Sequence, residues 1–100
     1  MNDIIKLFPN LNIIIEDNEG IHIKSSNELK LDDYKKIIKI LLYKIQSKEI
    51  KKDIILEFNN NLDELLRIIK FTGLLHCFKI IENNNLINKY PDLKVIEKDK

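Results

Sequence analysis

The chain has 100 residues, enough for one small domain with a single hydrophobic core and too few for two. Apolar residues make up 44% of it and charged residues 33%, which is typical of globular proteins and excludes disordered and fibrous classes. Seventeen basic residues against sixteen acidic ones leave a formal net charge of +1, so no overall field draws the protein to nucleic acid or anionic lipid.

The composition is biased in a way that affects how short motifs are read. Ile, Lys and Asn are abundant, Ala is absent and Val occurs only at Val95, as expected of an AT-rich genome, so runs of Asn or Lys indicate codon usage. The single cysteine, Cys77, cannot form an internal disulfide, which suits a reducing compartment. Neither a signal peptide nor a membrane span is visible, and we expect a cytoplasmic protein.

The first quarter of the chain predicts a short helix and a β-hairpin. Residues 1–9 form an amphipathic turn that ends at Pro9, because proline disfavours the helical conformation in the residue before it. Residues 11–16 and 21–24 have the β-branched enrichment of strands, and the Asp, Asn and Gly of residues 17–20 suit the turn between them. Apolar and polar residues alternate in the second strand, so one of its faces is apolar and the other is wet.

A long helix is predicted next. Residues 25–31 form a polar connection, and Ser26 or Asp32 can cap the helix by accepting a hydrogen bond from a free backbone amide. The apolar residues then recur at the i, i+3, i+4, i+7 spacing of a helix with one buried stripe. This stripe consists of Tyr34, Ile37, Ile38, Leu41, Leu42 and Ile45.

The second half of the chain repeats the strand and helix pattern. Residues 54–58 form a short apolar run that is typical of a strand buried on both faces. Asn61 suits the start of a second helix and Gly73 its end, since glycine readily adopts the left-handed conformation there. The buried stripe of this helix consists of Leu62, Leu65, Leu66 and Ile69.

The C-terminal part contains a further strand-like run at residues 76–81 and an Asn-rich loop, with one more short strand or helical turn around residues 93–96. The order strand, strand, helix, strand, helix, strand predicts an α/β fold with a small mixed four-stranded sheet and helices packed on one face. We therefore predict a single domain, with an N-terminal turn at 1–9, a core at 10–82, and a loop and tail at 83–100.

Residues 60–83, NNLDELLRIIKFTGLLHCFKIIEN, carry a family resemblance. A leucine-rich helix that runs through Thr72-Gly73-Leu74 into a strand with Phe78 and Ile80 resembles the C-terminal part of STAS domains, the anti-sigma-factor-antagonist family. The strand at 54–56 suits the same pattern. This resemblance implies a shortened STAS-like fold and a regulatory or scaffolding role.

The phosphorylation motif of that family is altered here. STAS domains that are switched by phosphorylation carry an Asp-Ser-Ser-Gly-like turn before a helix, whose serine or threonine accepts the phosphate. This chain has Lys24-Ser25-Ser26-Asn27, so Lys replaces the Asp and Asn replaces the Gly. Ser25 and Ser26 are the phosphoacceptor candidates that the resemblance offers, and a plain connection into the helix is the alternative.

The residue types that support catalysis or metal binding do not form a recognisable set. His76 and Cys77 are adjacent, but neighbouring residues on a strand point to opposite faces. The only other histidine, His22, leaves too few soft ligands for a closed zinc site. No base and orienting group are recognisable for a cysteine nucleophile.

Acidic residues and glycines have structural explanations. Asp32-Asp33 and Asp63-Glu64 lie at helix starts, where negative charge interacts favourably with the helix dipole. A chain with only Gly20 and Gly73 cannot form a glycine-rich phosphate loop. We therefore expect no enzymatic activity, no metal and no cofactor.

Both predicted helices carry more apolar residues than their buried stripes require. Ile40 and Tyr43 on the first helix, and Ile68 and Phe71 on the second, lie away from the buried stripes. Such residues either pack within the domain or form a contact patch for another protein. A basic rim could surround this patch, formed by Lys35, Lys36, Lys39, Lys44, Arg67 and Lys70.

The sequence thus predicts a non-catalytic protein–protein interaction module that docks an unidentified partner through Ile40, Tyr43, Ile68 and Phe71. One alternative is a structural subunit that associates with its own copy through a sheet edge or the Ile40–Tyr43 pair. Another is a small nucleic-acid-binding domain that uses the lysines of the first helix, which the near-zero net charge disfavours.

Overall fold

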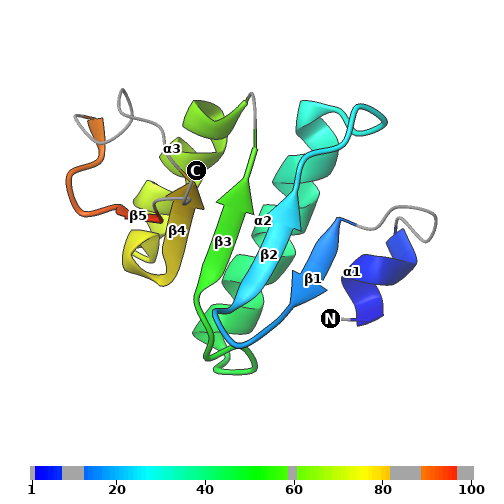
Figure 1. Ribbon diagram of the computed structural model, residues 1–100, viewed down its shortest axis with the longest axis horizontal. Coiled ribbons are helices and arrows are strands. Elements are labelled where there is room, and N and C mark those ends of the chain that lie inside the picture. The colour runs from blue at the N-terminus through cyan, green and yellow to red at the C-terminus, as the bar shows by residue number, and fades with distance from the viewer. Residues whose placement is uncertain (1, 8–12, 59–60, 82–88, 97–100) are drawn as a thin grey trace.

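The computed structural model describes residues 2–7, 13–58, 61–81 and 89–96. These residues form one five-stranded sheet, with two long helices on one of its faces and a short N-terminal helix at one end (Figure 1). The predicted α/β class, with a mixed sheet and helices on one face, is confirmed. None of the helices in the described ranges has the length and apolarity needed to cross a membrane.

The predicted N-terminal helical turn and the predicted order of strands and helices are both present, with a 3-10 turn before the fourth strand and a fifth strand after it. They are α1 (Asn2–Leu7), β1 (Ile14–Glu16), β2 (Ile21–Lys24), α2 (Leu31–Gln46), β3 (Ile54–Glu57), α3 (Leu62–Thr72), the 3-10 turn η1 (Leu75–Cys77), β4 (Phe78–Ile81) and β5 (Lys94–Ile96). The strands lie in sequence order across the sheet; β1 and β2 are antiparallel and the other pairs parallel. Because α2 and α3 each connect adjacent parallel strands, they pack against each other on the same face.

The hairpin between β1 and β2 is confirmed, and its turn is held by a side chain. Oδ1 of Asp17 accepts hydrogen bonds from the amides of Glu19 and Gly20, at 2.8 and 3.2 Å. Gly20 has a φ of 152° and lies against the backbone of Asp53, where the chain enters β3. The hairpin is therefore joined directly to the centre of the sheet.

The two long helices differ from expectation only at their caps. The predicted capping of α2 by Ser26 or Asp32 is wrong, because Lys30 is the N-cap residue and its amide donates to the carboxylate of Asp33 at 3.0 Å. Ser26 is instead fixed through its backbone, which donates to and accepts from the hydroxyl of Tyr34. The left-handed Gly73, with a φ of 76°, ends α3 as predicted.

The hydrophobic core lies between the helices and one face of the sheet. Alternate residues of the central strands point into it, among them Ile23, Leu56 and Phe78, and both predicted helical stripes meet them. The intervening residues face the other side, which no helix of the described chain covers (Figure 1). Ile55 is fully buried there, between His22 and Lys79 on the neighbouring strands, so β3 is buried on both faces as predicted.

The C-terminal region differs most from expectation. The sheet has five strands rather than four, because residues 94–96 pair with β4. Tyr90 and Leu93 are buried in the core, so residues placed in a predicted loop and tail contribute to it. The strand predicted at residues 76–81 begins only at Phe78, because the chain first makes a 3-10 turn after α3.

Candidate docking surface on the helix layer

The four predicted partner-binding residues divide into two exposed aromatic side chains and two half-buried isoleucines. Phe71 is 88% exposed and Tyr43 is 62% exposed. Ile40 and Ile68 pack partly against the core. The helix layer thus presents one large apolar side chain on each helix, supported by an isoleucine three residues earlier.

These residues line two separate hollows on the surface. Ile40 and Tyr43 border a shallow depression of about 400 Å³ near the C-terminal end of α2. Phe71 borders a larger groove of about 550 Å³ on α3. We name the second hollow the Tyr90 groove, and it is lined by Arg67, Lys70, Phe71, Lys89 and Tyr90.

Tyr90 forms the floor of this groove. Its side chain is only 5% exposed, and its hydroxyl donates a hydrogen bond of 2.8 Å to Oδ1 of Asp63 in the first turn of α3. Nζ of Lys70 lies 5.7 Å from the centroid of its ring, within the range of a cation–π contact. The contacts of Asp63 and Lys70 place this flank of α3 toward the segment that leads into β5.

Asp63 organises the charges at the groove. Its Oδ2 lies 2.7 Å from Nζ of Lys89 and 4.0 Å from Nη2 of Arg67. The bond from Lys89, followed by that from Tyr90, lowers the pKa of Asp63 below its ordinary value. Burial, followed by the hydrogen bond to Asp63, raises the pKa of the Tyr90 phenol. Two cations therefore lie beside one carboxylate, and with Lys70 over the Tyr90 ring the groove carries a net positive charge.

Comparisons of the chain with family models, curated proteins and solved structures gave no match. The similarity of residues 60–83 to STAS domains therefore stays a prediction. Sequence reasoning identified Phe71 from its position on the helix but missed Lys89 and Tyr90, which lie far along the chain. An aromatic residue directly before Pro91, in a tail rich in charged residues, was the available signal for a packed segment.

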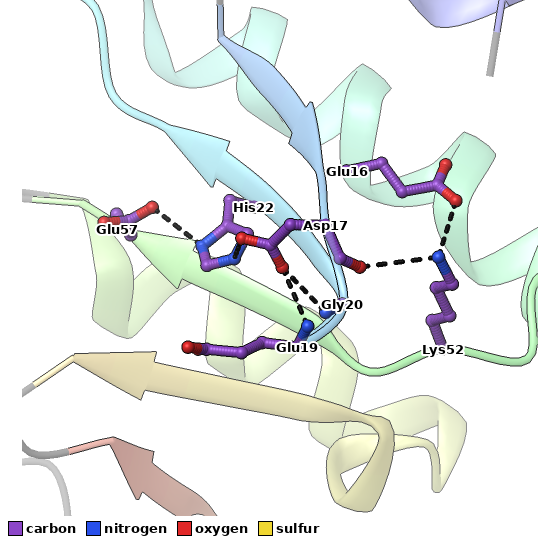
Figure 2. A network of polar contacts seen from close by, with 7 residues as sticks. All are labelled: Glu16, Asp17, Glu19, Gly20, His22, Lys52 and Glu57. Atoms are coloured by element: carbon purple, nitrogen blue, oxygen red, sulfur yellow. Dashed lines mark hydrogen bonds and ion pairs between the residues drawn. The ribbon is translucent and has the colours of Figure 1, made fainter.

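A second polar cluster lies on the opposite side of the sheet, where His22 on β2 sits between two carboxylates (Figure 2). Its Nδ1 is 3.1 Å from Oε2 of Glu57 on β3. Its Nε2 is buried and lies 2.9 Å from Oδ2 of Asp17. The cluster links the hairpin turn to the central strand.

This arrangement is suited to holding the hairpin. The carboxylates contact opposite edges of the imidazole, so they do not converge on one point where a cation could bind. Burial raises the pKa of Asp17, but the amide of Glu19, the ring of His22 and the amide of Gly20 outweigh it, so the net shift is downward. Nearby, Nζ of Lys52 pairs with Glu16 at 2.8 Å and ties β1 to the start of β3.

The remaining candidates from the sequence lie apart from one another. Ser25 and Ser26 are half-buried at the end of β2, and the hydroxyl of Ser26 accepts a hydrogen bond from the amide of Glu28. His76 is exposed, and Cys77 is half-buried with its thiol pKa raised by burial. In the described part of the chain, no three His, Cys, Asp or Glu side chains are arranged to hold a metal ion.

Proposed function

We propose that this chain is a non-catalytic protein-binding domain with a regulatory or scaffolding role, which docks a partner protein through the outer surface of α2 and α3. The observation that carries this proposal is the 88% exposure of Phe71 beside a groove of about 550 Å³. The similarity of residues 60–83 to STAS domains agrees with such a role.

Removing the exposed Phe71 side chain from water favours binding of a partner at this site. Covering a phenylalanine side chain is worth roughly 1.5–3 kcal/mol relative to leaving it in water. Aromatic and arginine side chains also contribute most to protein interfaces, and here Phe71 and Arg67 lie within one turn of α3. Because α3 is fixed by its buried stripe, little ordering free energy is lost when a partner binds.

The polar cluster on the other face also favours binding over catalysis. A catalytic histidine needs one ring nitrogen directed at the reacting group. Both nitrogens of His22 lie against carboxylate oxygens, and His22 lines neither of the two hollows on the helix layer.

A pull-down from the native cell tests this proposal. We expect Phe71→Glu to lose the partner and Tyr43→Glu to weaken its capture, while both variants keep the circular dichroism spectrum of the wild type. Ile15→Glu is the matched control, because Ile15 is also exposed and apolar but lies on the sheet face without helices. If the Phe71 and Tyr43 variants retain every partner, the docking face is wrong.

The same preparation tests the two alternatives. Sedimentation at high concentration reports on self-association, and a strict monomer removes the structural-subunit hypothesis. Retention on heparin or DNA at low salt reports on nucleic-acid binding through the lysines of α2, and absence of retention removes that hypothesis.

A further inference from the structure

We infer that the Tyr90 groove binds an acidic segment of the partner protein, one that places an apolar side chain against Phe71. This inference rests on the proposed function and names the chemistry of the partner.

The apolar part of the groove determines where an anchor side chain would sit. Phe71 stands exposed on one wall, and the buried ring of Tyr90 forms the floor. A hollow of about 550 Å³ lies within the range of sites that enclose small ligands, so it has room for the side chains of a peptide segment. The groove is therefore large enough for one aliphatic or aromatic anchor with polar neighbours.

The charged part of the groove determines which residues of the partner are favoured beside the anchor side chain. Arg67, Lys70 and Lys89 line it, and Asp63 is the carboxylate paired with two of them. Lys70 does not share that carboxylate, since its ammonium lies over the ring of Tyr90. Asp or Glu side chains beside the anchor would meet a net positive rim, whereas Lys or Arg there would be repelled.

The groove is formed before a partner arrives. Asp63 holds Lys89 at 2.7 Å and the hydroxyl of Tyr90 at 2.8 Å, which joins α3 to the segment before β5. Two walls from distant parts of the sequence are thus fixed by one side chain. Such preorganisation reduces the entropy lost on binding.

A protein segment fits these observations better than a nucleic acid. Binding of single strands depends on several exposed aromatic faces along a continuous positive track. Here Phe71 is exposed but Tyr90 is only 5% exposed, and Asp63 interrupts the positive charge. The groove can therefore hold one apolar anchor with a few acidic neighbours, and it lacks a track for a phosphate backbone.

Fluorescence anisotropy with three labelled probes tests the inference. The first probe is a short peptide with a central Phe flanked by Glu, the second replaces each Glu with Lys, and the third is a single-stranded oligothymidylate. We expect the acidic peptide to bind wild type at least about tenfold more tightly than the basic one, with affinity falling as salt rises. Phe71→Ala should weaken the acidic peptide by about tenfold or more.

Charge-reversal variants locate the contact. The double variant Arg67→Glu/Lys70→Glu should lose the acidic peptide and gain the basic one, an exchange that mere destabilisation cannot produce. Lys36→Glu is the matched control, since Lys36 is an exposed lysine on α2 outside the groove. An equal loss with Lys36→Glu would indicate general charge attraction and overturn the site.

The other outcomes separate this inference from the proposed function. Tighter binding of the oligothymidylate, abolished by the double variant, would replace the peptide with nucleic acid and overturn the inference. If the wild type dimerises and Phe71→Glu abolishes the dimer, a second copy of the chain occupies the groove, and the inference is again overturned. If neither peptide binds, the acidic segment is wrong, yet capture of a cellular partner that depends on Phe71 would leave the docking function standing.

Discussion

The close approach of Gly20 to the central strand makes a sharp prediction about stability. A Cβ atom at Gly20 would lie 2.2 Å from the carbonyl oxygen of Asp53, where ordinary contact begins at 3.4 Å. That oxygen is backbone and already accepts the amide hydrogen of Ile21 at 2.9 Å. Gly20→Ala therefore forces either the turn or the first β2–β3 hydrogen bond to move by about 1 Å.

Three effects determine the expected loss of stability. Overpacking costs about 1–3 kcal/mol. Weakening the hydrogen bond costs about 1 kcal/mol. Placing a side chain at a φ of 152° costs a further 1–3 kcal/mol or so. We expect Gly20→Ala to lower the free energy of unfolding by about 4 kcal/mol, a large share of the roughly 5–15 kcal/mol typical of a folded domain.

Gly73→Ala is the matched control, because Gly73 also has a positive φ, 76°, but a Cβ atom there meets nothing within 4 Å. Only the conformational cost of about 1–2 kcal/mol remains. Urea denaturation followed by circular dichroism measures both variants. If their losses agree to within about 0.5 kcal/mol, the contact with Asp53 does not govern stability and the reasoning is refuted.

Three further predictions concern the contacts of Tyr90 and Asp63 and the single cysteine. Tyr90→Phe removes the hydroxyl bound to Asp63 and should cost about 1–2 kcal/mol in the same urea assay, whereas no loss would show that water replaces it equally well. The pKa of Asp63 is lower in the folded protein than the 3.8 expected of the unfolded chain, so ionised Asp63 stabilises the fold above pH 3.8. This stabilisation is lost as the pH falls through the pKa of the folded protein. On acidification, the midpoint of urea unfolding should therefore fall more for wild type than for Asp63→Asn. Burial, followed by the charge of Asp53, raises the pKa of the Cys77 thiol, so iodoacetamide should alkylate Cys77 more slowly than free cysteine. Asp53→Asn removes that charge and should make the alkylation faster. Equal rates in wild type and Asp53→Asn would contradict a role for the charge.

Hydrophobic periodicity was sufficient to predict the centre of the fold. Ile21 and Ile23 alternate with polar neighbours because β2 has one face in the core, and residues 54–56 are continuously apolar because β3 is buried on both faces. The helical stripes follow from the same requirement. These signals are local, and each can be recognised in the sequence without knowledge of the neighbouring strands.

The features that sequence reasoning missed or left open depend on distant contacts. β5 has only three residues, so its short, partly polar sequence left a strand and a helical turn as alternatives, and pairing with β4 decides for the strand. The turn at residues 75–77 reverses the chain after α3, which the continuous strand-like sequence conceals. Phe71 could be predicted from its helical angle, but Lys89 belongs to the groove only through its contact with Asp63.

The groove and the C-terminal part of the fold therefore depend on the same contacts. Tyr90 is buried in the core while its hydroxyl binds Asp63, and Lys89 is held by the same carboxylate. A chain in which residues 89–96 are detached from the sheet would still expose Phe71 on α3, but it would lack the floor and one cation of the groove. Any ligand that requires the complete groove must consequently stabilise the packing of this segment, because it binds only the state in which the segment is in place.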